Sequence, residues 1–241
     1  MHPFNSSRCA VPVPPHRTDY GLRTTDHGLR RTFLLGTLLV SLVVVSCGSS
    51  PEAPADTFLK AIAEHCGQAF AGRVVADEPP APTNPFENQP LIMHVRTCEP
   101  GRVLVPFHVG DDRSRTWVLT RTATGLQLKH DHRHEDGSDD VLTMYGGDTT
   151  SAGTAIRQEF PVDAFSRELF ERQNAPASME NTWAMEIQPK RLFAYELTRP
   201  GRRFRVEFDL SAPVPAPPAP WALTRDSGLG ARDSGPGRRD P

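Results

Sequence analysis

The sequence lacks the features that would assign it at once to a common enzyme class or to nucleic-acid binding. Its 27 Lys and Arg residues are nearly balanced by 29 Asp and Glu, so there is no excess of basic charge to attract nucleic acid. Familiar signatures are absent: Gly-x-Ser-x-Gly, His-Glu-x-x-His, Ser-x-x-Lys and the dinucleotide fingerprint. These absences favour a protein that is not an enzyme.

One apolar run near the start is too short to cross a bilayer comfortably. It covers residues 32–45, follows Arg30 and Arg31, and has the length of the hydrophobic region of a secretory signal. It ends in small residues before Cys47, and the polar residues 48–51 come next. This segment resembles the lipobox of bacterial lipoproteins, in which small residues precede a cysteine that receives lipid and becomes the mature N-terminus.

The resemblance implies a processing site and an address. Cys47 is the expected lipidation site, residues 1–46 the segment that is removed, and residues 47–56 a flexible tether. The chain would then sit in the bacterial cell envelope, with the membrane as a partner through its lipid anchor. Because no Asp follows Cys47, the resemblance favours the outer membrane, facing the periplasm. An ordinary signal peptide or a buried apolar helix is the alternative.

Both ends of the chain carry seven-residue repeats, at residues 18–31 and 225–238. Neither repeat places two apolar residues in each heptad, so neither predicts a coiled coil. We interpret both as low-complexity sequence and predict that synthesis starts near Leu29. Residues 57–211 are then a single β-rich domain, followed at residues 212–241 by a proline-rich, low-complexity, disordered tail.

Export would leave two cysteines available for pairing. Cys9 lies in the removed segment and Cys47 carries the lipid, so Cys66 and Cys98 are predicted to form a disulfide in an oxidising periplasm. Closing a loop of about 32 residues predicts a stabilisation of about 3–4 kcal/mol. The alternative, a Cys66 nucleophile beside His65, is disfavoured because adjacent residues on a helix point apart.

The apolar pattern predicts a mainly β domain with two short helices. Helical spacing marks residues 56–70, with Asp56 as N-cap, and residues 161–173, opened by Asp163 or Pro161. Elsewhere the period is two, and the predicted strands are residues 91–96, 103–109, 115–121, 126–132, 141–145, 154–160, 181–187, 191–197 and 202–210. Short strands joined by tight turns predict an antiparallel β-barrel or β-sandwich of about 7–9 strands.

Three of the nine histidines lie at alternating positions around the end of one predicted strand. His130, His132 and His134 continue the face of Leu126 and Leu128, which should point inward. In a barrel these imidazoles would rise toward the open end, where side-chain packing gives way to a ligand mouth.

Two kinds of site fit this segment. Imidazoles on a strand can share one metal ion, and His130, His132 and His134 with Asp136 would suit zinc. The same three histidines could instead bind a ligand without a metal, together with Asp148 from the following Gly-Gly-Asp turn. A polar hairpin whose acids are simply solvated is the third interpretation.

Neighbouring residues fit the edge of such a site. Gly146 and Gly147 allow a close backbone approach or a bulge at a strand end. Arg113, Arg115 and Trp117 suit a rim for an anionic or aromatic ligand. The serines of this region, by contrast, have no catalytic motif around them.

These observations predict an envelope lipoprotein whose β domain binds a small ligand or an envelope protein, without catalysis, a cofactor or nucleic acid. The alternative is a metal-dependent hydrolase, in which zinc on the histidines acidifies a bound water and Asp136 or Glu135 takes its proton. A scaffold lipoprotein whose strand edges meet a partner is a third possibility.

Overall fold

The computed structural model describes residues 52–221 of the chain. The predicted signal peptide, the lipidation site Cys47 and the two heptad repeats lie outside these residues. In the described part, none of the helices has the length and apolar character that crossing a membrane requires.

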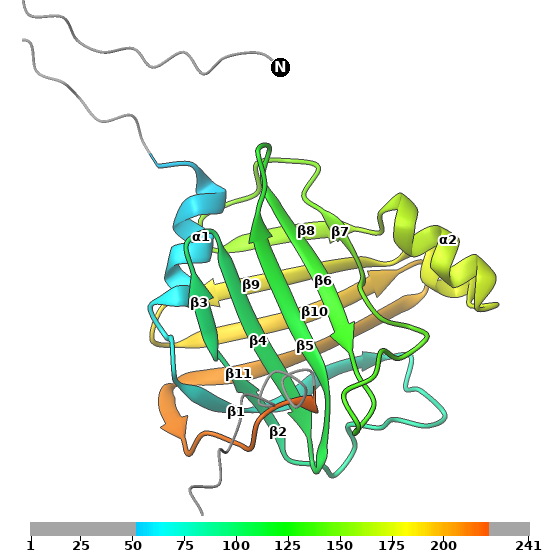
Figure 1. The fold of residues 1–241 in the computed structure, drawn as a ribbon, viewed down its shortest axis with the longest axis horizontal. Coiled ribbons are helices and arrows are strands. Elements are labelled where there is room, and N and C mark those ends of the chain that lie inside the picture. The colour runs from blue at the N-terminus through cyan, green and yellow to red at the C-terminus, as the bar shows by residue number, and fades with distance from the viewer. Residues whose placement is uncertain (1–51, 222–241) are drawn as a thin grey trace, which may run out of the picture. The chain divides into compact units, whose positions relative to one another are not determined.

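Eleven strands and two α-helices make up this part of the protein (Figure 1). The helices are α1 (Pro54–Ala63) and α2 (Ala164–Arg172), and a short 3-10 helix, η1, covers Pro176–Glu180. The strands are β1 (Ala69–Glu78), β2 (Leu91–His94), β3 (Thr97–Glu99), β4 (Arg102–Val109), β5 (Asp112–Arg121), β6 (Leu126–His132), β7 (Tyr145–Asp148), β8 (Arg157–Pro161), β9 (Thr182–Gln188), β10 (Leu192–Arg199) and β11 (Arg202–Val214).

The strands form one antiparallel sheet that curls into a nearly closed barrel. Its order is β7-β6-β5-β4-β2-β1-β11-β10-β9-β8, with the short β3 beside β4. Most strands that follow each other in sequence are therefore neighbours, and pairing of β1 with β11 joins the first strand to the last. The predicted mainly β fold is confirmed as barrel-like, with more strands than the 7–9 expected from sequence.

Strands β7 and β8, the two ends of the sheet, approach each other at a seam that contains two glycines. The Gly146 carbonyl accepts hydrogen bonds from the backbone N–H of Asp163 (3.0 Å) and from the Ser166 hydroxyl (3.0 Å), both at the start of α2. A side chain at Gly147 would place its Cβ 1.8 Å from the carbonyl oxygen of Pro161. The glycine pair thus provides the close backbone approach that its sequence suggested.

Helix α1 packs across one end of the barrel. It contacts β4 and β5 as well as β8 and β9, and its residues Phe58 and Ile62 are fully buried. Asp56 lies within the helix, where its carboxylate pairs with Arg121 of β5, so its predicted role as N-cap is wrong. The predicted disulfide between Cys66 and Cys98 is confirmed and ties the chain after α1 to β3.

The first predicted helix, residues 56–70, is wrong at its C-terminal end. The helix stops at Ala63, Gly67 takes a φ of 83°, and Ala69 and Phe70 begin strand β1. Their spacing is typical of a helix, but hydrogen bonds to both β2 and β11 stabilise these residues as a strand, so tertiary contacts override the local pattern.

Other boundaries differ by smaller amounts. The second helix spans 164–172 rather than 161–173, and Asp163 is its N-cap, accepting a hydrogen bond from the backbone N–H of Ser166 (2.8 Å). The strand predicted at residues 141–145 is wrong, because β7 begins only at Tyr145 after a long turn. The predicted bounds of β6 match the structure.

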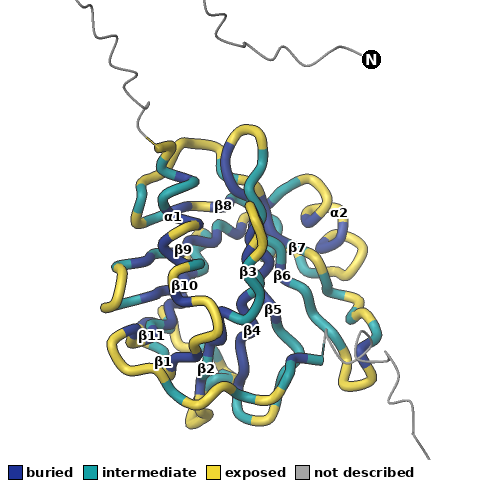
Figure 2. The backbone as a smooth tube through the Cα atoms, turned by 60° about the vertical axis from the view of Figure 1, so that its left-hand side comes forward, coloured by how far each residue is buried: buried dark blue, intermediate teal, exposed yellow. Residues whose placement is uncertain are grey.

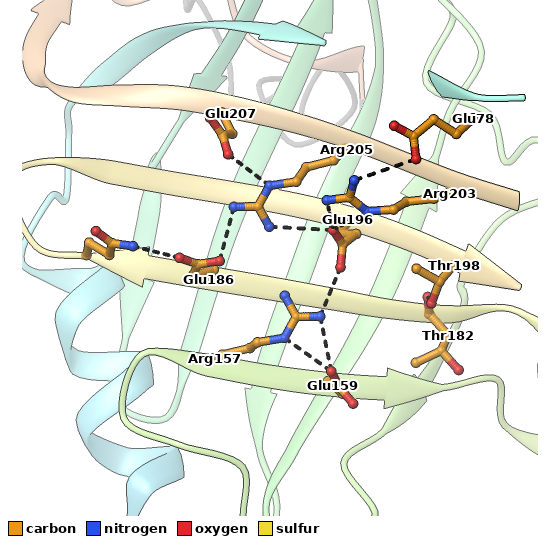
Figure 3. A network of polar contacts seen from close by, with 11 residues as sticks. Glu78, Arg157, Glu159, Thr182, Glu186, Glu196, Thr198, Arg203, Arg205 and Glu207 are labelled. Carbon is orange, nitrogen blue, oxygen red and sulfur yellow. Dashed lines mark hydrogen bonds and ion pairs between the residues drawn. The ribbon is translucent and has the colours of Figure 1, made fainter. Parts of the chain in front are cut away.

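The two faces of the sheet carry different side chains, and the strands hold most of the buried residues of the described part (Figure 2). Phe204, Val206, Phe208 and Leu210 alternate along β11 toward an apolar core, as predicted. The opposite face of β8–β11 carries a network of arginines and glutamates around Glu196 (Figure 3).

Candidate ligand site at the barrel mouth

Strand β6 carries one of the predicted histidines into the barrel. Leu126, Leu128 and His130 alternate along β6 and are all buried. In the paired strands His130 lies opposite Trp117 of β5 and Tyr145 of β7. The His130 ring stacks on the Tyr145 ring, with centroids 4.6 Å apart. The alternation of a strand therefore places this imidazole among aromatic side chains of the interior.

Both ring nitrogens of His130 are engaged in hydrogen bonds. Nδ1 lies 3.1 Å from the carbonyl oxygen of Tyr145, and Nε2 lies 2.9 Å from the hydroxyl of Tyr195. A carbonyl only accepts, so Nδ1 carries the proton and the Tyr195 hydroxyl donates to Nε2. Burial lowers the pKa of His130 to about 3, which keeps the ring neutral at neutral pH.

His132 occupies the next inward position of β6, nearer the open end. It lies opposite Arg115 in the β5–β6 pair, and its Nε2 is 3.2 Å from the Tyr145 hydroxyl. Burial, and then the charge of Arg115, lowers the pKa of His132 to about 4. Burial raises the pKa of Tyr145 to about 12. The contact is therefore a hydrogen bond between two neutral groups.

These side chains line a small cavity at the mouth of the barrel. Its volume is about 70 Å³. The lining residues are Phe86, Phe107, Arg115, Thr116, Trp117, His130, His132, Tyr145 and Tyr195. A water takes up about 30 Å³ in the liquid, so the cavity has room for a small chemical group rather than for a whole drug-sized ligand.

Arg115 is the cation of the mouth. It lies opposite Phe107 of β4, whose side chain belongs to the core, and its own side chain is only 22% exposed. One guanidinium nitrogen lies 2.5 Å from the carboxylate of Asp112. The guanidinium carbon lies 5.8 Å from the centre of the Phe86 ring. A positive charge that is paired with one carboxylate therefore lies at the entrance of an otherwise neutral, aromatic cavity.

Phe86 closes the mouth from the loop between β1 and β2. Its ring centroid is 5.9 Å from that of Phe107 and 4.9 Å from that of Phe204. The loop before it is anchored by Asp77, whose carboxylate accepts hydrogen bonds from the Ala81 backbone and the Asn84 side chain. Phe86 thus plugs the end of the barrel opposite α1.

The residues predicted to bind zinc do not fit a metal site. His134 lies beyond the end of β6 with a side chain that is 55% exposed, and Asp136 is exposed and accepts hydrogen bonds from Ser138. Both nitrogens of His130 are already bonded within the barrel. Among residues 52–221 there is no group of three or more His, Cys, Asp or Glu side chains placed to hold a metal ion.

The predicted ligand residue Asp148 also lies away from the cavity. It is exposed at the end of β7, and its carboxylate accepts a hydrogen bond from the Gln127 side chain (3.1 Å). Cys66 is in the disulfide, so it is not available as a nucleophile. Of the residues predicted as the rim, Arg115 and Trp117 line the cavity, whereas Arg113 lines a different pocket.

The sequence interpretation overlooked Tyr145, Tyr195 and Phe86. Tyr195 alternates with Phe193 and Leu197 in a predicted strand, so its inward direction could have been read from the sequence. Phe86 gave no such signal, because it lies in a proline-rich loop without periodicity.

Comparison of the chain with protein-family models, with curated proteins and with solved structures found no match. We therefore infer function from the residues of the site itself.

Proposed function

We propose that this chain is a non-enzymatic, lipid-anchored β-barrel of the bacterial envelope that binds a small carboxylate-bearing ligand at the barrel mouth. The supporting observation is the inward-facing Arg115 at the entrance of a cavity lined by aromatic rings and neutral imidazoles. The lipobox-like sequence at Cys47 supports the anchor and favours the outer membrane, with the domain in the periplasm.

The chemistry of the mouth defines the ligand class. Arginine forms paired, charge-assisted hydrogen bonds with a carboxylate, and these are stronger than neutral ones. Phe107 and Trp117, stacked with ring centroids 4.9 Å apart, offer a flat apolar wall. A ligand with a carboxylate at one end and a planar apolar body matches both features.

Phe86 limits how much of the ligand enters. Its ring occupies the space next to Phe107 and Phe204 that a planar ligand would need. We propose that the ligand displaces Phe86 and takes its place, with the carboxylate exchanging with Asp112 on Arg115. Affinity should therefore increase when this side chain is removed, because no free energy is spent in moving it.

No observation favours the alternative of a metal-dependent hydrolase. The histidines that would have held the metal are divided between the barrel interior and an exposed turn.

Fluorescence titration with 2-naphthoate tests the ligand proposal, with the uncharged 2-naphthamide as control. Phe86→Ala should bind 2-naphthoate at least about tenfold more tightly than the wild type, because no ring has to be displaced. Arg115→Gln should bind it about tenfold more weakly, because a charge-assisted hydrogen bond is worth about 1.5–3 kcal/mol. Arg102→Gln, an exposed change on the outside of β4, should leave affinity unchanged. No saturable binding to Phe86→Ala, or equal binding by Arg115→Gln, would contradict the proposal.

The anchor is tested separately by replacing Cys47. In a bacterial host, the wild type should incorporate labelled palmitate and remain in the membrane fraction, whereas Cys47→Ser should do neither. A wild-type chain that is released in soluble form would contradict the anchor and leave the ligand proposal intact.

A further inference from the structure

A second pocket lies on the outside of the barrel, beneath the end of the described chain. After β11 the chain crosses the outer face of the sheet, where the Arg113 guanidinium donates a hydrogen bond to the carbonyl of Ala219 (3.1 Å) and Pro220 is buried. The pocket below this segment has a volume of about 500 Å³, which lies in the range of small-molecule sites. It is lined by Ile92, His108, Gly110, Asp111, Arg113, Glu135, Pro217, Pro218 and Trp221.

A β-bulge separates this pocket from the barrel mouth. Phe107 pairs with Arg115, but Val109 pairs with Asp112, so β5 holds one extra residue opposite His108. The extra residue reverses the direction of the preceding side chains. Arg115 therefore faces the barrel mouth, while Arg113, two residues earlier, lines the outer pocket with His108.

The pocket contains charges of both signs that lack an ion pair. Arg113, Asp111 and Glu135 form no salt bridge with any other residue in the described part of the chain. Two other arginines of β5 and β4 behave differently: Arg115 pairs with Asp112, and Arg102 with Glu99. Charges of opposite sign that line one pocket without forming an ion pair match the two charges of a zwitterion.

His108 adds an unused hydrogen-bonding group to the same pocket. Its side chain is buried, with only 3% of the residue exposed, and Nε2 has no hydrogen-bond partner within residues 52–221. Burial, and then the neighbouring His94, lowers the pKa of His108 to about 4. A buried polar atom without a partner costs free energy, which a ligand can recover by bonding to it.

We propose that this pocket binds a free amino acid or the end of a short peptide. The carboxylate would pair with Arg113, the ammonium with Asp111 and Glu135, and His108 would bond one of the polar groups. The apolar side chain would pack on Ile92, Pro217 and Trp221. This site is independent of the carboxylate site at the mouth, because the two use opposite faces of β4 and β5.

Calorimetric titration of the lipid-free full-length protein with L-phenylalanine and with L-leucine tests this proposal. Arg113→Gln should weaken binding at least about tenfold, the loss expected for one charge-assisted hydrogen bond. Arg115→Gln is the matched control and should change the affinity for amino acids less than twofold. The same two variants should show the opposite pattern with 2-naphthoate, so failure of one site is distinguishable from failure of the other.

Two analogues test the requirement for both charges. 3-Phenylpropionate lacks the ammonium group and phenethylamine lacks the carboxylate. Both are titrated into Arg115→Gln, so that the mouth site does not contribute, and both should bind more weakly than phenylalanine does. Glu135→Gln changes an exposed side chain, where substitutions have little effect on stability. It should reduce the preference for phenylalanine over 3-phenylpropionate. The proposal is overturned if neither amino acid gives saturable binding, if 3-phenylpropionate binds as tightly, or if Arg113→Gln has no effect.

Discussion

The barrel mouth and the outer face of β8–β11 bury polar groups by different means. At the mouth the polar side chains are neutral: His130 bonds the Tyr195 hydroxyl and the Tyr145 backbone carbonyl, and the Tyr145 hydroxyl bonds His132. On the outer face, Glu196 is nearly buried and is contacted by three arginines (Figure 3). The comparison shows that one sheet can compensate buried polarity either with neutral groups or with paired charges.

The pKa shifts of the two regions favour opposite charge states. The histidines of the mouth are kept neutral, whereas the glutamates of the outer face are kept ionised. Inside, burial dominates and favours uncharged imidazoles. Outside, burial acts to raise the pKa of Glu196, but hydrogen bonds from Arg157 and Arg203 outweigh it and hold that pKa below its ordinary value. The same holds for Glu186, with hydrogen bonds from Gln188 and Arg205. The two regions should therefore lose stability in different ranges of pH.

The largest expected effect is loss of stability in mild acid. The pKa is about 3 for folded His130 and about 4 for His132 and His108, against 6.5 when unfolded. The unfolded chain then binds protons that the folded chain does not, so stability is complete above about pH 6.5 and falls toward about pH 4. Each histidine contributes up to about 1.4 kcal/mol per pH unit. Urea unfolding at about pH 7, 5.5 and 4.5 measures this loss.

The acidic residues of the outer face should add a second decline at lower pH. Because the pKa values of Glu196 and Glu186 are lowered from 4.5, their stabilisation is present above that value and is lost as pH falls below it. Equal stability at about pH 7 and 5 would contradict the assignment of neutral, buried histidines.

The next largest effect should come from removing the central acid of the outer network. Glu196→Gln leaves Arg157, Arg203 and Arg205 without the carboxylate they share, while each keeps a second acidic partner. Loss of hydrogen bonds to this charged group should cost about 1.5–3 kcal/mol. Glu159→Gln is the control, because Glu159 also binds Arg157 but its side chain is 57% exposed. The control should change the free energy of unfolding by less than about 0.5 kcal/mol. Equal effects in both variants would show that the network is not buried in solution.

Local sequence patterns predicted the parts of this fold that depend on neighbours in the chain. The alternation along 126–132 gave both the bounds of β6 and the inward direction of His130. The sequence offers Asp163 or Pro161 as the start of α2, a signal that needs only a few residues, and the structure selects Asp163 as the N-cap. The disulfide follows from counting the cysteines that the predicted export would leave.

The parts that were not predicted depend on contacts between distant segments. The hydrogen bond between His130 and Tyr195 joins positions 65 residues apart and requires the closed barrel. Arg113 and Arg115 face opposite sides of the sheet because β5 contains a bulge. In the sequence this bulge is only one extra residue. The failure of His134 to face inward has a simpler cause: β6 ends at His132 and the chain turns.

A smaller effect should come from removing one neutral hydrogen bond inside the barrel. Tyr195→Phe deletes the hydroxyl that donates to Nε2 of His130 and leaves that buried nitrogen without a partner, at a cost of about 1–3 kcal/mol. Tyr145→Phe should cost less, because its hydroxyl bonds the half-buried His132. Denaturant unfolding of both variants tests the order. A Tyr195→Phe protein as stable as the wild type would mean that water replaces the bond.

The smallest expected effect is that of salt on the wild-type protein. At about 1 M salt the screening length is about 3 Å, so exposed pairs such as Arg157 with Glu159 are weakened. The side chains of Glu196 and Arg205 are each only about one-tenth exposed, so the pair between them is shielded from solvent. The free energy of unfolding should fall by less than about 1 kcal/mol between low salt and about 1 M sodium chloride. A much larger decrease would mean that the outer network is open to solvent, and the two faces of the sheet would then differ in charge but not in burial.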